Sequence, residues 1–430
     1  MLRKMLVMLL TVTLVLTSGM FLTAGATDKG QLDVLTYWTG ADELAIREAI
    51  GVYETAHPKV KVNFESLAAP EYKLTFAREI MTEPRDLYSA WNGTFTMEWA
   101  AKGALQNLTT FWAGAGLDDV VYKDFKEEGW AKCPGPDGKM GIYWVPHVLQ
   151  VRSTFYHKEL FDSLGLGVPT TWDEYTNILR TLKANGILPI VVGTMGEAYG
   201  MQPLIGHLIV GHCGIDFAKK LSQGKESYRD SRVEAAFREF KDFLDVGYLN
   251  SDMCATRFDE ALRKFGRGEA GMWWRATWGS SSLVGEFGWV DGVNYATFTP
   301  PPRFPNIPVP DLGYADGWVI PEGSEDPELA AVFIKTMVSA DAQRAHSVIR
   351  GHGVTINKHI MPSEYVAANA PSKADQLRHY RESSIYLTLI DQFTPKFVDD
   401  YTIIISELVT GVIDVPEAIN RLEAARRADY

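Results

Sequence analysis

The feature that most limits how this chain can fold is an alternation of strand and helix patterns near its start. Leu32–Trp38 is an apolar run typical of a strand, and Asp42–Ala56 follows with apolar residues at helical spacing. Val60, Val62 and Phe64 then alternate with polar residues, as in a strand that buries one face. Strands that alternate with helices predict an α/β fold, with an open sheet and helices on its faces.

The same local signals recur further along the chain. Thr171 and Glu174 match a capping box, in which each side chain satisfies a free N–H at the start of a helix. An apolar helical face follows this box. Pro189–Gly193 predicts a strand that leads into a loop, and later helices are predicted to begin at Pro327 and near Pro416.

Residues 1–26 have the pattern of a secretory signal peptide: a basic start, a short apolar segment and a small-residue cleavage motif that ends at Ala26. The apolar segment is interrupted by hydroxyl residues and is short for a membrane span, although an uncleaved anchor is the alternative. Since no cysteine lies near the predicted cut, lipid attachment is not expected. The sequence therefore predicts a free periplasmic protein that is cleaved near Ala26.

The chain is acidic, with a formal net charge of −12. Removing the predicted signal, which contains two basic residues and no acidic ones, makes the mature protein more acidic still. This charge argues against nucleic acid and anionic membrane surfaces as partners, because both attract basic proteins.

Sequence signatures of catalysis are missing. The chain contains no G-x-x-x-x-G-K-[ST] loop and no H-E-x-x-H motif, and Gly279–Leu283 lacks the second glycine of a nucleophile elbow. His207, His212 and Cys213 have a spacing that fits no usual zinc pattern. We therefore expect no metal, no cofactor and no catalysis. The 54 acidic residues nevertheless leave open the carboxylate pair of a glycosidase.

Three cysteines allow at most one disulfide within the chain, and an oxidising compartment would permit it. We expect a Cys213–Cys254 bond, because both residues fall in the same predicted lobe, with Cys133 left as a thiol. The alternative is that all three are small buried hydrophobic residues.

The chain contains 12 tryptophans, and several follow predicted strands or turns, where open α/β folds bind ligands. An indole presents a flat apolar face to the C–H groups of a pyranose, and Asp, Asn, Glu, Gln or Arg side chains can bind its hydroxyls. A single tryptophan is nevertheless more often a core residue. We assign to the core Trp99, Trp112, Trp130, Trp172 and Trp289.

Several segments, taken in order, resemble a known family, the extracellular solute-binding proteins of ABC sugar importers of the maltose-binding-protein type. The resemblance covers nearly the whole mature chain and rests on the order and spacing of its motifs. These are Ala56–Val62, Trp91–Gly93, Gly103–Leu108, Gly141–Pro146, Phe155–Phe161, Pro169–Glu174, Gly186–Pro189, Phe265–Met272 and Ala330–Gln343. His157 stands where the family usually has asparagine.

This resemblance implies a two-lobed periplasmic-binding-protein fold of type II, with a ligand cleft between lobes that are joined by hinge crossings. Breaks in the pattern predict crossings at Val145–His147, in the proline-rich segment Pro300–Pro310 and at Arg350–Gly353. After the signal at 1–26, the predicted parts are 27–146 and 299–349 for the first lobe, and 147–298 and 350–430 for the second.

The resemblance also implies a carbohydrate ligand, closure of the lobes on binding, and delivery to the membrane subunits of an ABC importer by a protein that we expect to be monomeric. Two alternatives are a secreted carbohydrate-active enzyme and the same scaffold with a non-sugar solute. Matching the family's cleft positions selects as ligand-binding candidates Trp38, Trp91, Asn92, Trp274, Trp278, Asp316 and Trp318, with Tyr37, Glu98, His147, Gln202, Arg275 and Arg350 as weaker ones. Which of Trp273, Trp274 and Arg275 faces the cleft stays open, since alternation puts Trp273 and Arg275 on one face.

Overall fold

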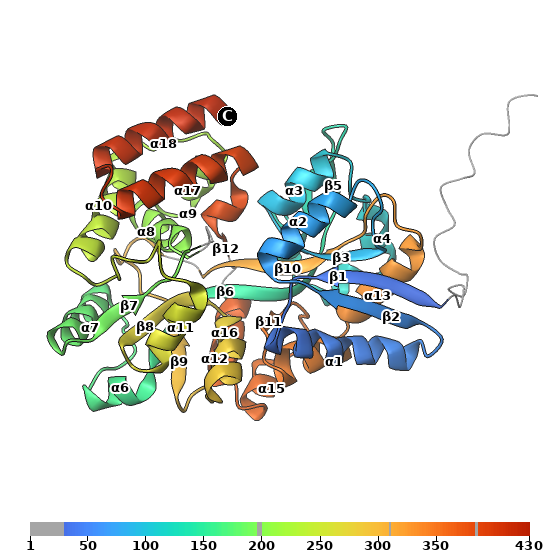
Figure 1. Cartoon of the computed structure of the whole chain (residues 1–430), viewed down its shortest axis with the longest axis horizontal. Coiled ribbons are helices and arrows are strands. Elements are labelled where there is room, and N and C mark those ends of the chain that lie inside the picture. Colours follow the sequence, from blue (N-terminus) through green and yellow to red (C-terminus); the bar gives the residue numbers. More distant parts are fainter. Residues whose placement is uncertain (1–29, 196–199, 309–310, 383–385) are drawn as a thin grey trace, which may run out of the picture.

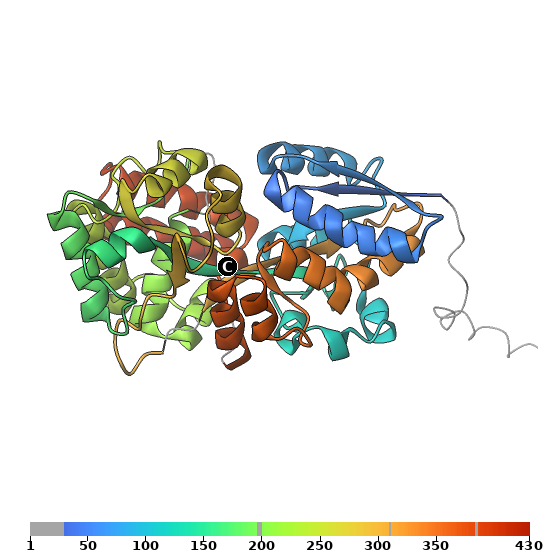
Figure 2. The same cartoon turned by 90° about the horizontal axis from the view of Figure 1, so that it is seen from below.

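The structure is a computed structural model that describes residues 30–195, 200–308, 311–382 and 386–430. The predicted signal peptide at residues 1–26 lies outside the described residues. Two lobes stand side by side in both views (Figure 1, Figure 2). Each lobe has its own buried apolar cluster, so the predicted two-lobed α/β architecture is confirmed.

The first lobe begins with the predicted strand–helix–strand unit. The helix occupies Ala41–Ala56 and the first strand Gln31–Thr36, close to the predicted bounds. Its apolar residues at helical spacing face the core, with Ile46, Ile50 and Tyr53 buried along one side of the helix. The elements of this lobe are β1 (Gln31–Thr36), α1 (Ala41–Ala56), β2 (Lys61–Ser66), α2 (Ala69–Glu79), β3 (Leu87–Trp91), α3 (Thr94–Ala101), α4 (Thr109–Gly114), α5 (Leu117–Val120), η1 (Lys123–Lys126), β4 (Lys132–Pro134), β5 (Met140–Ile142), α13 (Pro327–Met337), α14 (Ala340–Gln343), η2 (Arg344–Ile349), β11 (Val354–Thr355), α15 (Pro362–Ala367) and α16 (Pro371–Glu382).

The second lobe contains the predicted capping box. The Thr171 hydroxyl accepts from the Glu174 N–H at 3.2 Å, and the Glu174 carboxylate accepts from the Thr171 N–H at 3.2 Å. The elements of this lobe are α6 (Lys158–Ser163), α7 (Trp172–Ala184), β7 (Leu188–Val191), α8 (Gln202–Cys213), α9 (Ile215–Ser222), α10 (Ser231–Asp245), α11 (Phe258–Gly266), β8 (Ala270–Ala276), α12 (Gly279–Phe287), β9 (Tyr295–Phe298), β12 (Tyr386–Leu387), η3 (Leu389–Gln392), α17 (Pro395–Val409) and α18 (Val415–Asp429).

One sheet connects the lobes, with the strand order β2-β1-β3-β10-β6-β8-β7. Its two central strands are β6 (Val145–His157) and β10 (Leu312–Val319), which pair antiparallel. β6 pairs with β10 through its first half and with β8 and β9 through its second half. It therefore runs from one lobe into the other (Figure 1).

Apolar packing indicates where these two strands pass from one lobe to the other. Along β6, Val151 packs in the first cluster, whereas Tyr156 packs in the second. Along β10, Leu312 belongs to the second cluster and Ala315 to the first. A continuous strand satisfies its backbone hydrogen bonds in both lobes, which a proline-rich loop cannot do.

The third crossing comes later than the sequence suggests. Residues between Val354 and Tyr380 pack in the first cluster, although the predicted second lobe began at residue 350. Tyr386 and Leu389 pack in the second cluster, whereas Leu387 between them still packs in the first, so the packing passes from one lobe to the other at β12. The other predicted lobe boundaries remain a prediction.

The expected Cys213–Cys254 disulfide is wrong, because all three cysteines are free thiols. Cys213 is buried at the end of α8. Cys254 is partly buried and lies within hydrogen-bonding reach of the Thr194 and Ser406 hydroxyls. Cys133 and Cys213 are therefore buried, as the alternative predicted, whereas Cys254 is only partly buried.

Candidate functional site

Aromatic side chains from the carboxyl ends of two neighbouring strands meet where the lobes join. Tyr37 follows β1 and Trp91 ends β3, and these strands are parallel neighbours. Their rings stack with centroids 3.8 Å apart and an interplanar angle of 15°. The amine of Lys73 lies 5.2 Å from the centre of the Trp91 ring. The first lobe thus presents a flat, partly exposed aromatic surface at this edge of the sheet.

A buried carboxylate on β10 anchors this surface. Asp316 accepts from the Tyr37 hydroxyl at 2.6 Å and from the Gln150 amide at 2.9 Å. Burial raises the pKa of the Asp316 carboxyl above its usual value, although the two hydrogen bonds oppose that shift. Burial and the neighbouring Asp316 also raise the pKa of the Tyr37 phenol, so the phenol remains a donor.

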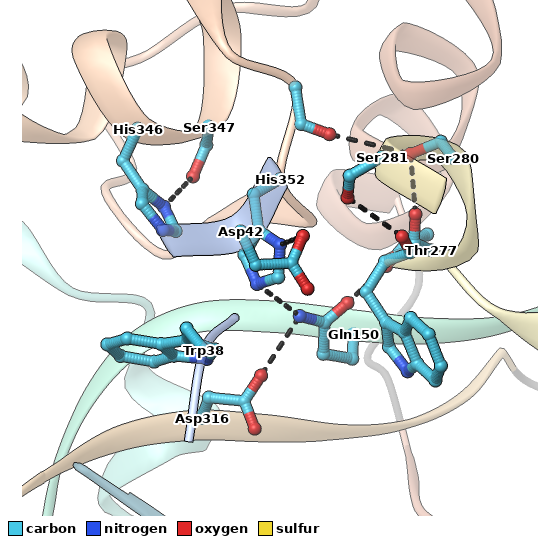
Figure 3. Close-up of polar contacts among 12 residues, drawn as sticks. Trp38, Asp42, Gln150, Thr277, Ser280, Ser281, Asp316, His346, Ser347 and His352 are labelled. Atoms are coloured by element: carbon cyan, nitrogen blue, oxygen red, sulfur yellow. Dashed lines mark hydrogen bonds and ion pairs between the residues drawn. The ribbon is translucent and has the colours of Figure 1, made fainter. Parts of the chain in front are cut away.

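The hydrogen bonds continue from Gln150 to both lobes (Figure 3). Its amide nitrogen also lies 3.2 Å from Nε2 of His352, and Nδ1 of His352 lies 2.7 Å from Asp42. With Nε2 as the acceptor, the imidazole proton sits on Nδ1 and is donated to Asp42. On the other side, the Thr277 hydroxyl donates to Gln150 Oε1 at 2.9 Å. This chain of contacts connects the start of α1 with the end of β8.

A second buried carboxylate comes from the other lobe. Asp391 lies in η3, and its Oδ2 is buried without a hydrogen-bond partner in the described residues. Burial raises the pKa of this carboxyl to about 7; Arg152 and Lys73 oppose the shift, and Asp316 adds to it. The Arg152 guanidinium also lies 4.8 Å from the centre of the Tyr314 ring.

Three of the predicted site residues lie together inside the first lobe. Trp318 is fully buried, and its ring is 5.2 Å from that of Trp38 and 5.5 Å from His147. Trp38 and Trp318 belong to the apolar cluster of this lobe. The structure gives these two indoles a packing role beneath the site, and their predicted ligand contacts stay a prediction.

The second lobe contributes two predicted residues whose polar atoms lack partners. Trp274 is buried with its ring 5.5 Å from His207, and its Nε1 has no partner among the described residues. Gln202 begins α8 and has an unpartnered Oε1, while its amide nitrogen is 3.5 Å from the Thr402 hydroxyl.

The structure shows which face of β8 each residue around Trp274 occupies. Trp273 and Arg275 lie on one face of β8, since both contact Phe258, whereas Trp274 points to the opposite face. The Arg275 guanidinium lies 4.4 Å from the ring centre of Trp278, which is partly exposed at the start of α12.

Two of the predicted site residues, Glu98 and Arg350, form ion pairs elsewhere. Glu98 pairs with Lys102 one turn along α3, and the exposed Arg350 pairs with Glu48 on α1. Asn92, in contrast, is buried beside Trp91, with its Oδ1 accepting from the Ala315 N–H at 2.9 Å.

Sequence reasoning missed Gln150, Arg152, His352 and Asp391. A signal for the first two was present, because Gln150 and Arg152 alternate with the apolar residues Leu149 and Val151. The other two follow no local pattern, since their role depends on what the crossings bring together.

The described residues contain no group of three or more His, Cys, Asp or Glu side chains that could hold a metal ion. Within the same described ranges, no helix is long and apolar enough to span a bilayer.

Comparison with known proteins shows which family and which structures this chain resembles. Residues 37–344 match the family described as bacterial extracellular solute-binding protein. An uncharacterized ABC transporter extracellular-binding protein of Pyrococcus horikoshii is 24% identical over 320 residues, which is 73% of this chain and 70% of that protein. A probable sugar-binding periplasmic protein of Brucella suis is 25% identical over 363 residues, covering 79% of this chain and 78% of that protein. The solved structure of a chitin oligosaccharide binding protein has a TM-score of 0.77 at 21% identity, covering 93% of this chain and 98% of that one.

Proposed function

Because this chain belongs to the bacterial extracellular solute-binding proteins, we propose that it captures a carbohydrate between its lobes and delivers it to the membrane subunits of an ABC importer. The relative from Brucella suis is named for sugar binding, and the similar structure is named for a chitin oligosaccharide. Both names fit a saccharide ligand for this chain.

One observation carries the proposal. Buried polar atoms from both lobes lack hydrogen-bond partners near the junction: Asn92 Nδ2 from the first lobe, and Gln202 Oε1, Trp274 Nε1 and Asp391 Oδ2 from the second. Such atoms cost free energy when they are left unpaired, so they are retained where a ligand completes them. Two partly exposed indoles, Trp91 beside Asn92 and Trp278 at the start of α12, suit the apolar face of a sugar.

Of the residues predicted from the sequence, we propose that Tyr37, Trp91, Asn92, Gln202, Trp274, Trp278 and Asp316 form the binding site. The described arrangement fits a closed form, because the lobes contact each other on both sides of the central strands. The Thr94 hydroxyl of α3 donates to the Phe393 carbonyl at 2.5 Å, and α1 contacts α12. A ligand that contacts both lobes binds the closed state more tightly and shifts the population toward it.

The hydrogen bonds of Asp316 suit binding rather than turnover. Both oxygens of Asp316 already accept hydrogen bonds, from Tyr37 and Gln150. A carboxylate held in this way orients neighbouring donors and is poorly placed to transfer a proton. We therefore propose that the protein is not catalytic. From its sequence we also propose that it is exported to the periplasm after cleavage near Ala26 and acts as a monomer.

A thermal-shift screen of the mature protein tests the proposal, because a ligand that binds only the folded state raises its melting temperature. The screen contains neutral mono- and oligosaccharides, with amino acids, short peptides and polyamines as competing classes, and calorimetry measures the affinity of each stabilising compound. We expect at least one saccharide to stabilise the protein and to remain intact after prolonged incubation. Stabilisation by another class alone, or hydrolysis of the sugar, would overturn the proposal.

A further inference from the structure

The two lobes touch directly beside Asp391. Asn92, Gly93 and Thr94 connect β3 to α3 in the first lobe and pack against η3 of the second lobe. A Cβ atom placed on Gly93 would lie only 3.3 Å from the Cβ of Asp391. The Asp391 side chain is thus held next to the loop that carries Asn92, and only 6% of the residue is exposed.

One unpaired acceptor and one unpaired donor belong to the two segments that meet at this contact. Oδ2 of Asp391 and Nδ2 of Asn92 are both buried without a partner in the described part of the chain. The orientation of the Asn92 amide is fixed, because its Oδ1 accepts from the Ala315 N–H at 2.9 Å. A sugar hydroxyl, which donates one hydrogen bond and accepts others, matches such a pair.

Charged groups of both signs act on Asp391. Arg152 of β6 and Lys73 of α2 act on the carboxyl from the positive side, and Asp316 of β10 acts from the negative side. A hydroxyl, which donates and accepts hydrogen bonds, can bind beside these groups without adding a charge. A ligand bearing a carboxylate or an ammonium group would add an uncompensated buried charge, which is costly.

We propose that Asp391, together with Asn92, selects a neutral ligand by binding one hydroxyl from both lobes at once: Asp391 Oδ2 accepts its proton and Asn92 Nδ2 donates to its oxygen. This inference rests on the proposed carbohydrate function and goes beyond it by assigning the selecting residue. Because the two atoms belong to different lobes, the hydroxyl is bound completely only when the lobes are closed.

A pH dependence follows, with a definite sign. The Asp391 carboxyl has its pKa raised to about 7 by burial, and its ionised form accepts the ligand hydroxyl proton more strongly than its neutral form does. Affinity is therefore highest above pH 7 and falls as the pH drops through about 7, by at most about tenfold per pH unit. By the same linkage, binding at pH 7 releases a fraction of a proton.

The test uses the mature protein and the tightest binder among maltose, cellobiose, xylobiose and chitobiose. Asp391→Asn keeps the shape of the side chain and removes the charge. We expect its affinity to fall at least tenfold, since hydrogen bonds to charged groups are among the stronger ones. The pH dependence between pH 6 and 8 should disappear with it.

Asp311→Asn is the matched control. Asp311 is also a buried aspartate near the junction, but its oxygens are bonded to the Thr299 hydroxyl and to the His379 ring. This variant should keep both the affinity and the pH profile of the parent. Calorimetry of the unaltered protein in two buffers of different ionisation enthalpy measures proton release independently of any variant.

The outcomes separate the two proposals. If a disaccharide binds the unaltered protein but Asp391→Asn keeps its affinity and pH profile, the role of Asp391 is refuted and carbohydrate binding stands. If Asp391→Asn does not fold, absence of proton release from the unaltered protein on sugar binding refutes the role. If no saccharide binds the unaltered protein while another solute does, both proposals are overturned.

Discussion

Replacing Gly93 by alanine should prevent the lobes from closing fully. Gly93 precedes α3 with φ 70° and ψ −135°, and the new Cβ would lie 2.0 Å from the backbone oxygen of Asp391. An ordinary contact begins at about 3.4 Å. Because the atom that is struck belongs to the backbone of the opposite lobe, no side-chain rotation relieves the overlap, and the lobes must separate.

Two free-energy terms can be distinguished. An alanine in this backbone conformation costs about 1–3 kcal/mol whether the lobes are open or closed, so this term lowers the melting temperature alone. The overlap exists only in the closed form, where it also breaks the bond from the Thr94 hydroxyl to the Phe393 carbonyl. We expect at least a tenfold loss of ligand affinity, which corresponds to about 1.4 kcal/mol.

Gly40→Ala is the matched control for backbone strain. Gly40 precedes α1 with φ 62° and ψ −123°, and a Cβ there meets nothing within 4 Å. Calorimetry would measure the affinity of both variants, and small-angle X-ray scattering at saturating ligand would measure their radii of gyration. We expect the ligand to compact the Gly40→Ala protein and not the Gly93→Ala protein. Equal affinity and equal compaction in the two variants would refute the reasoning.

Three further predictions follow from the packing of individual side chains. Trp278→Ala should weaken sugar binding at least tenfold by calorimetry. Trp289 is a partly buried tryptophan at the other end of α12, and Trp289→Ala should leave the affinity unchanged. Equal effects of the two substitutions would refute the stacking role of Trp278. Thiol titration in denaturant should find three reactive groups without reductant, since all three cysteines are free, and a count of one would restore a disulfide. Burial lowers the pKa of His147 to about 3 and that of His207 to about 4, so between pH 6.5 and about 4 the unfolded chain binds more protons. The free energy of unfolding should therefore fall as the pH falls, by up to about 1.4 kcal/mol per pH unit for each histidine. Urea titrations at pH 7 and pH 5 measure this free energy. If a His207→Gln variant shows the same change between the two pH values, the histidines are not its cause.

Much of the local structure could be predicted from the sequence, because its signals are short in range. The helix predicted at Asp42–Ala56 is confirmed as Ala41–Ala56, and the box predicted at Thr171 caps α7. Hydrophobic periodicity and capping depend on residues three or four positions apart, so they survive without knowledge of the chain path. The order of the family motifs extended these local signals to a two-lobed α/β fold.

The points at which the chain passes between the lobes could not be predicted from such local signals. The predicted crossings at Val145–His147 and Pro300–Pro310 come at the start of β6 and before β10 in the sequence, but they do not show how far along these strands the lobe changes. A continuous strand that passes between two cores has no break to detect. The same limit applies to the cysteines, whose separation in space depends on how α8 packs.

What the sequence determined by itself is therefore the class of fold and its strand–helix units, and the residues that it selected for the site remain a prediction. The tertiary structure decided which residues meet. The bond from Tyr37 to Asp316 joins positions 279 residues apart, and that from His352 to Asp42 joins positions 310 apart. Packing also separated Trp318, which lies in the core, from Trp278, which is partly exposed. Contacts over such distances depend on the whole path of the chain, and no local pattern encodes them.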